Sequence, residues 1–158
     1  MTAVTLLDLT RSLPGIEIDT APQTLAAYGS DQGPVLEYIN PLAVVWAESV
    51  GQVQEILRWA SRSGTAVVPR GAGTGVSGGA HATAGCIILS LERMNKIIEI
   101  RPEDELAVVE PGVINADLNA AAAEFGLMYA PDPASYRIST IGGNVATNAG
   151  GLRCAKYG

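Results

Sequence analysis

Five glycines crowd into nine positions of the sequence, residues 71–79. Because glycine has no Cβ, such a run lets consecutive backbone N–H groups turn toward one concavity and lets a ligand touch the main chain. Loops of this kind bind phosphate groups. The alternative is a flexible surface loop without a ligand, since glycine-rich loops also occur without any binding role.

The context of this run excludes three familiar phosphate-binding loops. Gly73, Gly75 and Gly78 match the spacing of the dinucleotide fingerprint, but that motif must open a helix, whereas Gly85 leads into a predicted strand at Cys86. No Lys-Ser or Lys-Thr pair follows the glycines, which excludes a Walker loop. The Val-Ala-Ile-Lys strand and His-Arg-Asp loop of protein kinases are absent from the sequence. The run is therefore predicted to be a phosphate cradle of another architecture.

A second segment with little side-chain bulk follows about 60 residues later, at residues 131–135 and 140–151. If residues 143–147 form one helical turn, its free N–H groups are expected to point at an anion or at the polar edge of a ring. Two such segments joined by a sheet suit a long ligand with both a pyrophosphate and a ring system. Dinucleotides are ligands of this kind.

These motifs resemble the FAD-linked oxidases of the vanillyl-alcohol oxidase (PCMH) type. Within that family they are most similar to the branch of glycolate oxidase catalytic subunits, D-lactate dehydrogenases and D-2-hydroxyglutarate dehydrogenases. The resemblance rests on residues 69–80, 111–113, 131–133, 140–151 and 156–158. It covers most of the chain from about Asn40 onward. The resemblance implies FAD as the cofactor, with the first loop on its pyrophosphate and the second segment along its ribityl chain and flavin.

The resemblance assigns FAD-binding roles to residues of both segments. In the first loop they are Arg70, Gly71, Ala72, Gly73, Thr74, Gly75, Val76, Gly78 and Gly79. Further along the chain they are Pro111, Pro131, Asp132, Ile141, Gly142, Gly143, Asn144, Ala146, Thr147, Asn148, Gly150 and Gly151. Relatives with covalently attached flavin carry a histidine inside the first loop, whereas the single histidine here, His81, lies just beyond it. Non-covalent FAD is therefore expected, and His81 is expected to be an ordinary loop residue.

The implied reaction is the oxidation of a D-2-hydroxy acid, such as glycolate or D-lactate, to the 2-oxo acid. The implied partners are the small hydroxy acid and an electron-accepting subunit or quinone. Two alternatives stay open: the same flavin fold acting on another alcohol, and a non-catalytic, truncated flavin-binding module. Members of the family run to several hundred residues and carry their substrate-binding and acid/base groups in a C-terminal part. We therefore expect this chain to be an inactive N-terminal fragment, and no catalytic residue is assigned.

Two strands flanking a helix are predicted in the N-terminal half. Residues 42–47 and 66–69 are short apolar runs typical of buried strands. Between them Ser49 and Gln52 form a capping box, and apolar residues recur at helical spacing until Gly64 supplies the stop. A strand–helix–strand unit normally closes as a right-handed parallel crossover.

The C-terminal half predicts more strands and a second helix. Three β-like runs, at residues 86–91, 96–101 and 106–110, are expected to continue the sheet. Asn115 is expected to cap a helix that ends at Gly126. The apolar face of that helix is predicted to consist of Leu118, Ala121, Ala122 and Phe125.

The expected fold class is α+β. It would consist of a small parallel strand–helix–strand lobe followed by a mixed or antiparallel lobe. Residues 1–40 are expected to form an N-terminal extension with a short helix within residues 3–13. Residues 41–158 are expected to form an FAD-binding domain of the PCMH type that is incomplete at its C-terminus.

Composition narrows the class of partner. The net charge of −6 and a pI near 4.7 argue against nucleic acid, whose binding relies on clustered Lys and Arg. The apolar runs are much shorter than the roughly 18 residues that a bilayer span needs, so we do not expect an integral membrane protein. The N-terminus does not resemble a secretory signal, which favours a cytoplasmic location. Cys86, Cys154 and His81 lack metal-ligand spacing, so no metal is expected.

Other residues with chemical potential favour ordinary roles. Four carboxylates without a partner in the spacing are expected to be solvated loop residues: Asp31, Asp104, Glu110 and Asp132. Trp46 and Trp59 fit the core of the predicted strand and helix. Cys154 lies near the second segment and is expected to be a buried or partly buried spectator.

Overall fold

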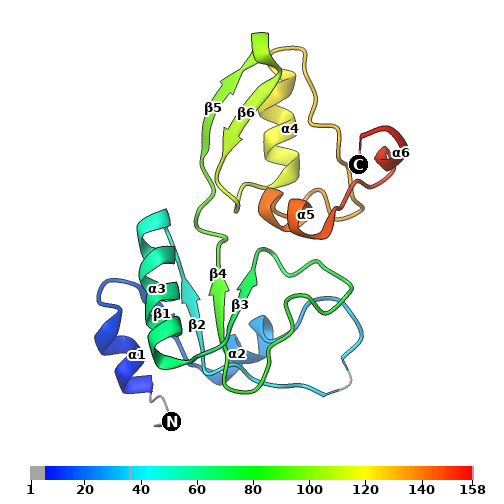
Figure 1. Cartoon of the computed structure of the whole chain (residues 1–158). Helices are drawn as coiled ribbons and strands as arrows, with labels where there is room; N and C mark the ends of the chain where they lie inside the picture. Colours follow the sequence, from blue (N-terminus) through cyan, green and yellow to red (C-terminus); the bar gives the residue numbers. More distant parts are fainter. Residues whose placement is uncertain (1–5, 36, 158) are drawn as a thin grey trace. The chain divides into compact units, whose positions relative to one another are not determined.

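A computed structural model describes residues 6–35 and 37–157 (Figure 1). The chain divides into two compact units, with the boundary between Arg93 and Met94. The elements of the first unit are α1 (Leu6–Ser12), β1 (Glu17–Asp19), α2 (Pro22–Tyr28), β2 (Ala43–Trp46), α3 (Val50–Ser63), β3 (Val67–Arg70) and β4 (Ile87–Ser90). The predicted N-terminal helix is found as α1, and residues 3–5 of that prediction lie outside the described residues.

The first unit is built on a four-stranded sheet with the order β1-β2-β4-β3. Strands β2, β4 and β3 are parallel, and β1 pairs with β2 in antiparallel fashion. The predicted strand–helix–strand unit is therefore present, but β4 lies between its two strands. Both β2 and β4 are buried throughout, which explains why they are continuous apolar runs without alternation.

The sheet carries helices that bury its side chains. On one face, Val44, Trp46 and Ile88 form a cluster against which Leu25 and Tyr28 of α2 pack. Because successive strand residues point to opposite faces, their neighbours in β2 and β4 point to the other face, and α3 lies along the sheet in Figure 1. Trp59 of α3 is buried, so both tryptophans are core residues as predicted.

Helix α3 begins and ends where its caps predict. The Ser49 hydroxyl accepts a hydrogen bond from the Gln52 backbone N–H at 3.3 Å. The Gln52 side chain accepts from the N–H of Glu48 at 2.7 Å, one residue earlier than in a standard capping box. Gly64 ends the helix in the left-handed region, at φ 70°, and its N–H donates to the Ala60 carbonyl.

The second unit contains a separate sheet. Its elements are β5 (Ile97–Arg101), the short 3-10 helix Pro102–Asp104, β6 (Leu106–Val109), α4 (Asn115–Ala123), α5 (Ile141–Thr147) and α6 (Cys154–Tyr157). Strands β5 and β6 pair only with each other in the described chain, so the prediction that all three later runs continue one sheet is correct for β4 alone. The reason is local. The connection is so short, with Glu105 in the left-handed region at φ 52°, that the two strands close an antiparallel hairpin.

Helix α4 packs on this hairpin (Figure 1), where Ile97 of β5 and Val109 of β6 lie against a core of Val113, Leu118 and Ile141. The prediction that Asn115 caps α4 is wrong. Ile114 is the N-cap residue and makes no side-chain cap, while the buried Asn115 side chain donates instead to the Pro131 carbonyl at 3.0 Å.

The C-terminal end of α4 also differs in part from the prediction. Helix α4 ends at Ala123, so Phe125 lies beyond it and is 52% exposed instead of joining the apolar face. Gly126 does stop the chain from continuing as a helix, at φ 72°. Among the described residues, no helix combines the length and the apolar character needed to cross a membrane.

Candidate functional site

The first glycine loop presents a row of unused donors. In the part of the chain that the structure describes, none of the backbone N–H groups from Gly71 to Gly79 has a hydrogen-bond acceptor. The loop is held through its carbonyls instead, since the Gly75 carbonyl accepts from Gln32 N–H at 2.8 Å and the Gly78 carbonyl from His81 N–H at 3.1 Å. Backbone donors without a protein partner must be satisfied by water or by a ligand. The loop therefore has the donor set of an anion cradle.

The second half of this loop is also accessible. A Cβ at Gly79, the last residue of the run, would meet no protein atom within 4 Å, and Val76, three residues earlier, is 68% exposed. Nothing in the fold itself therefore requires glycine at position 79, where φ is not in the left-handed region. Gly73 differs, because it has φ 69° and its backbone lies directly against the guanidinium of Arg70. Glycine is needed there for packing.

Arg70 lies beneath the loop and not on its surface. The residue is only 9% exposed, and its Nη1 donates to the Ser30 carbonyl at 2.7 Å. Its guanidinium also stacks over the Tyr28 ring, 5.1 Å from the centroid. Burial lowers the pKa of Arg70, and the charges of Glu92 and Asp31 partly oppose this shift, but an arginine stays protonated in proteins. Arg70 thus places a buried positive charge next to Gly73, and its side chain is not exposed at the surface of the loop.

Asp31 is a site residue that sequence reasoning missed. It was expected to be a solvated loop carboxylate, but its side chain is 1% exposed. Its Oδ1 accepts from the Gly33 N–H at 2.8 Å and lies 2.8 Å from His81 Nε2. His81, expected to be an ordinary loop residue, is therefore the partner of a buried acid. The Asp31-Gln32-Gly33 sequence, typical of an Asx turn, is the one local signal that could have indicated this role.

The pKa of Asp31 is lower than usual. Burial of the carboxylate acts to raise it, but the N–H groups of Gly33 and Ala80 and the imidazole of His81 together outweigh burial. Asp31 is therefore ionised at neutral pH. A second backbone bond, from Ala82 N–H to the Gly29 carbonyl at 2.8 Å, joins the same two segments. Residues 29–33 thus lie alongside the glycine loop and are bonded to it.

The second segment is built differently, although α5 is present as predicted. Thr140 is its N-cap, and the Thr140 hydroxyl accepts from the Gly143 N–H at 3.2 Å. The preceding N–H groups are also used: Ile141 donates to the Val113 carbonyl and Gly142 to the Pro111 carbonyl, both at 2.8 Å. The prediction of free N–H groups at this helix start is therefore wrong, because neighbouring loops of the same unit occupy them.

The glycines of this segment serve contacts within the protein. A Cβ at Gly142 would lie 2.6 Å from Pro111 Cβ and 2.9 Å from the Pro111 carbonyl oxygen. Gly151 has φ 69° and lies directly against the backbone of Asp132. The Asp132 carboxylate accepts from Arg153 N–H at 3.2 Å. The glycines were predicted to allow close contact with a ligand. At Gly142 and Gly151 the close contact is instead with other backbone segments of the same unit.

Gly142→Ala is expected to destabilise the second unit by about 1–3 kcal/mol, because the added methyl overlaps the backbone of Pro111. Thermal unfolding of the two proteins measures the effect. Gly51→Ala in the exposed first turn of α3 is the matched control, since its methyl would meet only Ser49 Oγ at 3.8 Å. An unchanged unfolding temperature for Gly142→Ala would refute the packing role.

Two polar side chains of the second unit keep unused capacity. Asn144 is 5% exposed and its Nδ2 donates to no acceptor in the described chain. The Ser139 hydroxyl, also buried, is unpaired in the same sense. A buried amide without a partner is costly, so it marks a place where a ligand or water is expected. Asn144 is the one residue predicted for this segment whose side chain has a free buried donor.

The remaining predicted residues belong to the same two segments. Gly71, Ala72 and Thr74 are half-buried in the first loop of the first unit. Four others lie in the second unit and hold the segment together through backbone and hydroxyl contacts: Pro131 accepts from Asn115, Thr147 donates to Gly143, Asn148 caps α5, and Gly150 accepts from Asp132. Ala146, also in the second unit, is exposed.

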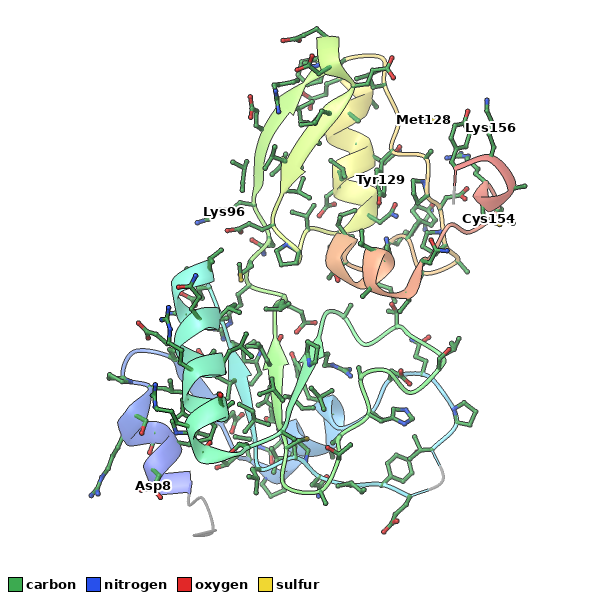
Figure 2. The ribbon with its side chains drawn as sticks, in the orientation of Figure 1. Asp8, Lys96, Met128, Tyr129, Cys154 and Lys156 are labelled. Atoms are coloured by element: carbon green, nitrogen blue, oxygen red, sulfur yellow. The ribbon has the colours of Figure 1, made fainter. Side chains whose placement is uncertain are left out.

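The other candidates gain no role from the structure. Asp104 pairs with Arg101, and Glu110 accepts from the Lys96 N–H at 2.8 Å, so the carboxylates are not brought together. Cys154 lies on α6 with Lys156 (Figure 2) and is exposed, so the expectation that it is at least partly buried is wrong. Within the described residues, no group of three or more side chains could hold a metal ion.

Comparison with known proteins identifies the family. Residues 41–158 match the family model of an FAD binding domain. The chain belongs to this FAD-binding domain family. The resemblance predicted from its motifs is thereby confirmed, and FAD is the cofactor that the family implies.

Relatives of this FAD-binding domain include two curated proteins. Over the whole chain it is 42% identical to D-2-hydroxyglutarate dehydrogenase of Xanthomonas citri pv. viticola, of which it covers 33%. Over 97% of the chain it is 42% identical to glycolate oxidase subunit GlcD of Escherichia coli, of which it covers 30%. The chain thus spans about a third of the length of these relatives. The solved structure of an alkyldihydroxyacetonephosphate synthase has a TM-score of 0.80 at 20% identity, covers 89% of this chain with 28% of its own, and shows the same fold.

The residues present fit FAD. Its diphosphate needs hydrogen-bond donors, and the first loop of the FAD-binding domain offers an unbroken row of them with open space at Gly79. In a chain with a net charge of −6, backbone N–H groups hold an anion without adding surface cations. Within the second unit, the free amide of Asn144 is a donor of the kind that the polar atoms of a ring or a ribityl chain accept.

Proposed function

We propose that this chain is the FAD-binding part of a flavin-dependent oxidoreductase that oxidises a D-2-hydroxy acid to the 2-oxo acid. The observation that carries the FAD-binding role is the row of unpaired N–H groups from Gly71 to Gly79. The substrate class is supported by the two relatives, whose names specify D-2-hydroxyglutarate and glycolate. A D-lactate dehydrogenase of Anaerostipes hadrus, 39% identical over 94% of the chain, belongs to the same substrate class.

In this proposal the first loop binds the diphosphate. The N–H groups of residues 71–79 donate to its oxygens, and Arg70 contributes positive charge from beneath Gly73. A buried charge acts over a few ångströms of poorly polarisable protein, where Coulomb interactions are stronger than in water. Thr74 and Val76 shape the rim of the loop. The binding is then dominated by the main chain, so it requires the loop's conformation more than any one side chain.

The second segment is proposed to bind the ribityl and flavin part. Asn144 offers its free Nδ2, while Gly142 and Gly151 fix the shape of the segment through their contacts with Pro111 and Asp132. When bound, FAD supplies the acceptor for the two electrons removed from the alcohol carbon. The protein's part is to hold that acceptor in place and to exclude competing reactions. We propose a small 2-hydroxy acid and an electron-accepting subunit or quinone as the partners.

We expect the FAD to be bound without a covalent link. No histidine lies within residues 71–79, and the imidazole of His81 is engaged with Asp31 at 2.8 Å. The protein is incubated with FAD, freed of excess by gel filtration and precipitated with acid. Yellow supernatant over a colourless pellet is the expected result.

Two outcomes would contradict this proposal in different ways. Flavin that stays in the washed pellet would show covalent attachment and refute the non-covalent mode alone. Absence of a flavin spectrum after gel filtration, from a protein shown to be folded by circular dichroism, would defeat the assignment of FAD itself.

A further inference from the structure

The first glycine loop rests on a buried carboxylate. Asp31 has a side chain that is 1% exposed, and a Cβ at Gly75 would lie 3.2 Å from its Oδ2. A negative charge directly beneath a loop that binds an anion is unfavourable unless something else requires it. The contacts of Asp31 indicate what requires it.

Asp31 connects residues 29–33 to the end of the glycine loop at Ala80 and His81. On its own segment it accepts from the Gly33 N–H at 2.8 Å, and on the far end of the loop it interacts with the Ala80 N–H and with His81 Nε2 at 2.8 Å. Ala80 is the first residue after the glycine run. The carboxylate therefore uses the N–H groups just outside the loop, and those of residues 71–79 are left without a protein acceptor.

Two groups near Asp31 favour its ionised form. Two cationic or titratable groups face it, the imidazole of His81 from the end of the loop and the guanidinium of Arg70 from the end of β3. Arg70 also stacks on the ring of Tyr28, whose hydroxyl donates to Glu92 at 2.9 Å. With the His81 imidazole at 2.8 Å and the positive charge of Arg70 acting on it, the carboxylate keeps its charge although its side chain is only 1% exposed.

From this geometry we propose that Asp31 is the positioning residue of the glycine loop: its carboxylate, paired with His81, holds residues 71–80 in the conformation that binds the FAD diphosphate. This inference rests on the proposed function. Asp31 itself touches no ligand in this proposal. It acts by fixing where the unpaired N–H groups point.

The test compares Asp31→Asn with a matched control, Asp19→Asn. Asp19 also accepts a backbone N–H, from Ala21 at 2.7 Å, and a hydroxyl, from Thr24 at 2.6 Å, but it lies in β1 and not at the loop. Both variants lose a carboxylate that organises local backbone. An asparagine at position 31 can keep an amide oxygen in the place of Oδ1, next to Gly33 and His81, but it puts an NH₂ in the place of Oδ2 and removes the negative charge that interacts with His81 and Arg70.

FAD affinity is measured by flavin fluorescence at 20 °C for proteins shown to be folded. Asp31→Asn is expected to raise the Kd for FAD at least tenfold, and Asp19→Asn less than twofold. ADP, which carries the diphosphate without the flavin, is expected to lose affinity in the same proportion when it competes with FAD. Hydrogen exchange adds a local readout, because the amides of Gly33 and Ala80 should exchange faster in Asp31→Asn while those of α3 stay unchanged.

A Kd within twofold of wild type for folded Asp31→Asn would overturn the inference and leave FAD binding itself intact. Equal losses in Asp31→Asn and Asp19→Asn would also overturn it, because they would indicate a general effect on the fold. Should Asp31→Asn not fold, His81→Ala decides, since His81 lies at the rim and is more exposed. It is expected to weaken FAD about fivefold, and unchanged affinity would refute the pairing. A wild type that binds neither FAD nor ADP would instead reject the proposed function.

Discussion

Gly79→Ala is expected to weaken FAD binding about tenfold, or about 1.4 kcal/mol, while leaving the fold unchanged. In the absence of ligand the new methyl would meet no protein atom within 4 Å, and the backbone at this position is not in the left-handed region. A loss of affinity would therefore come from the space that the ligand needs. Titration with FAD, together with thermal unfolding of the ligand-free protein, measures both quantities.

Gly75 is a less suitable position for the same experiment. A side chain there would press on Asp31, with 3.2 Å between the new Cβ and Oδ2, so Gly75→Val would change the loop itself as well as the ligand's space. Gly51→Ala in α3 is the matched control. It should leave FAD affinity unchanged and stabilise the helix by up to about 1 kcal/mol. FAD binding by Gly79→Ala as tight as that of wild type would show that the diphosphate does not approach this part of the loop.

The 158-residue chain supplied with FAD is expected not to oxidise D-2-hydroxyglutarate, glycolate or D-lactate at a measurable rate. The reaction needs a group to take the hydroxyl proton and a cation to hold the substrate carboxylate. The single histidine of the sequence is engaged with Asp31, and Arg70 is buried under Gly73. Without substrate positioning, the rate loses an effect that amounts to roughly 7–11 kcal/mol in well-oriented reactions.

An assay of dye reduction with each of the three acids decides this point. A curated relative of full length, such as the Xanthomonas D-2-hydroxyglutarate dehydrogenase, serves as the positive control, because this chain matches about a third of it. Turnover by the 158-residue chain at a comparable rate would show that the groups acting on the substrate lie within residues 1–158.

Features of the chain that depend on neighbours in sequence could be predicted. The caps of α3 at Ser49 and Gly64 involve hydrogen bonds over three or four residues, so their residue types alone indicate them. The glycine run at residues 71–79 is also local, because missing Cβ atoms act on the backbone that carries them. The strands β2 to β6 and the helices α1, α3 and α4 could be predicted for the same reason, from short apolar runs and from apolar residues at helical spacing.

Sheet partners could not be predicted in the same way. A short apolar run indicates that a strand is present but not which other strand it pairs with. Strands β5 and β6 pair with each other in one hairpin. The same limit applies to Gly142, whose type predicts a close approach without indicating that Pro111 is what approaches.

The sequence by itself determined the FAD-binding family of this chain, the strands β2 to β6, the helices α1, α3 and α4, and the position of the glycine-rich loop at residues 71–79. Only the tertiary structure decided that Asp31 and Arg70 lie beneath that loop. Asp31 meets His81 across 50 positions of the chain, and Arg70 meets Ser30 across 40, through contacts that the packing of α2 and the sheet creates. Such pairs leave no period or spacing in the sequence, because the contact depends on how distant segments fold against each other.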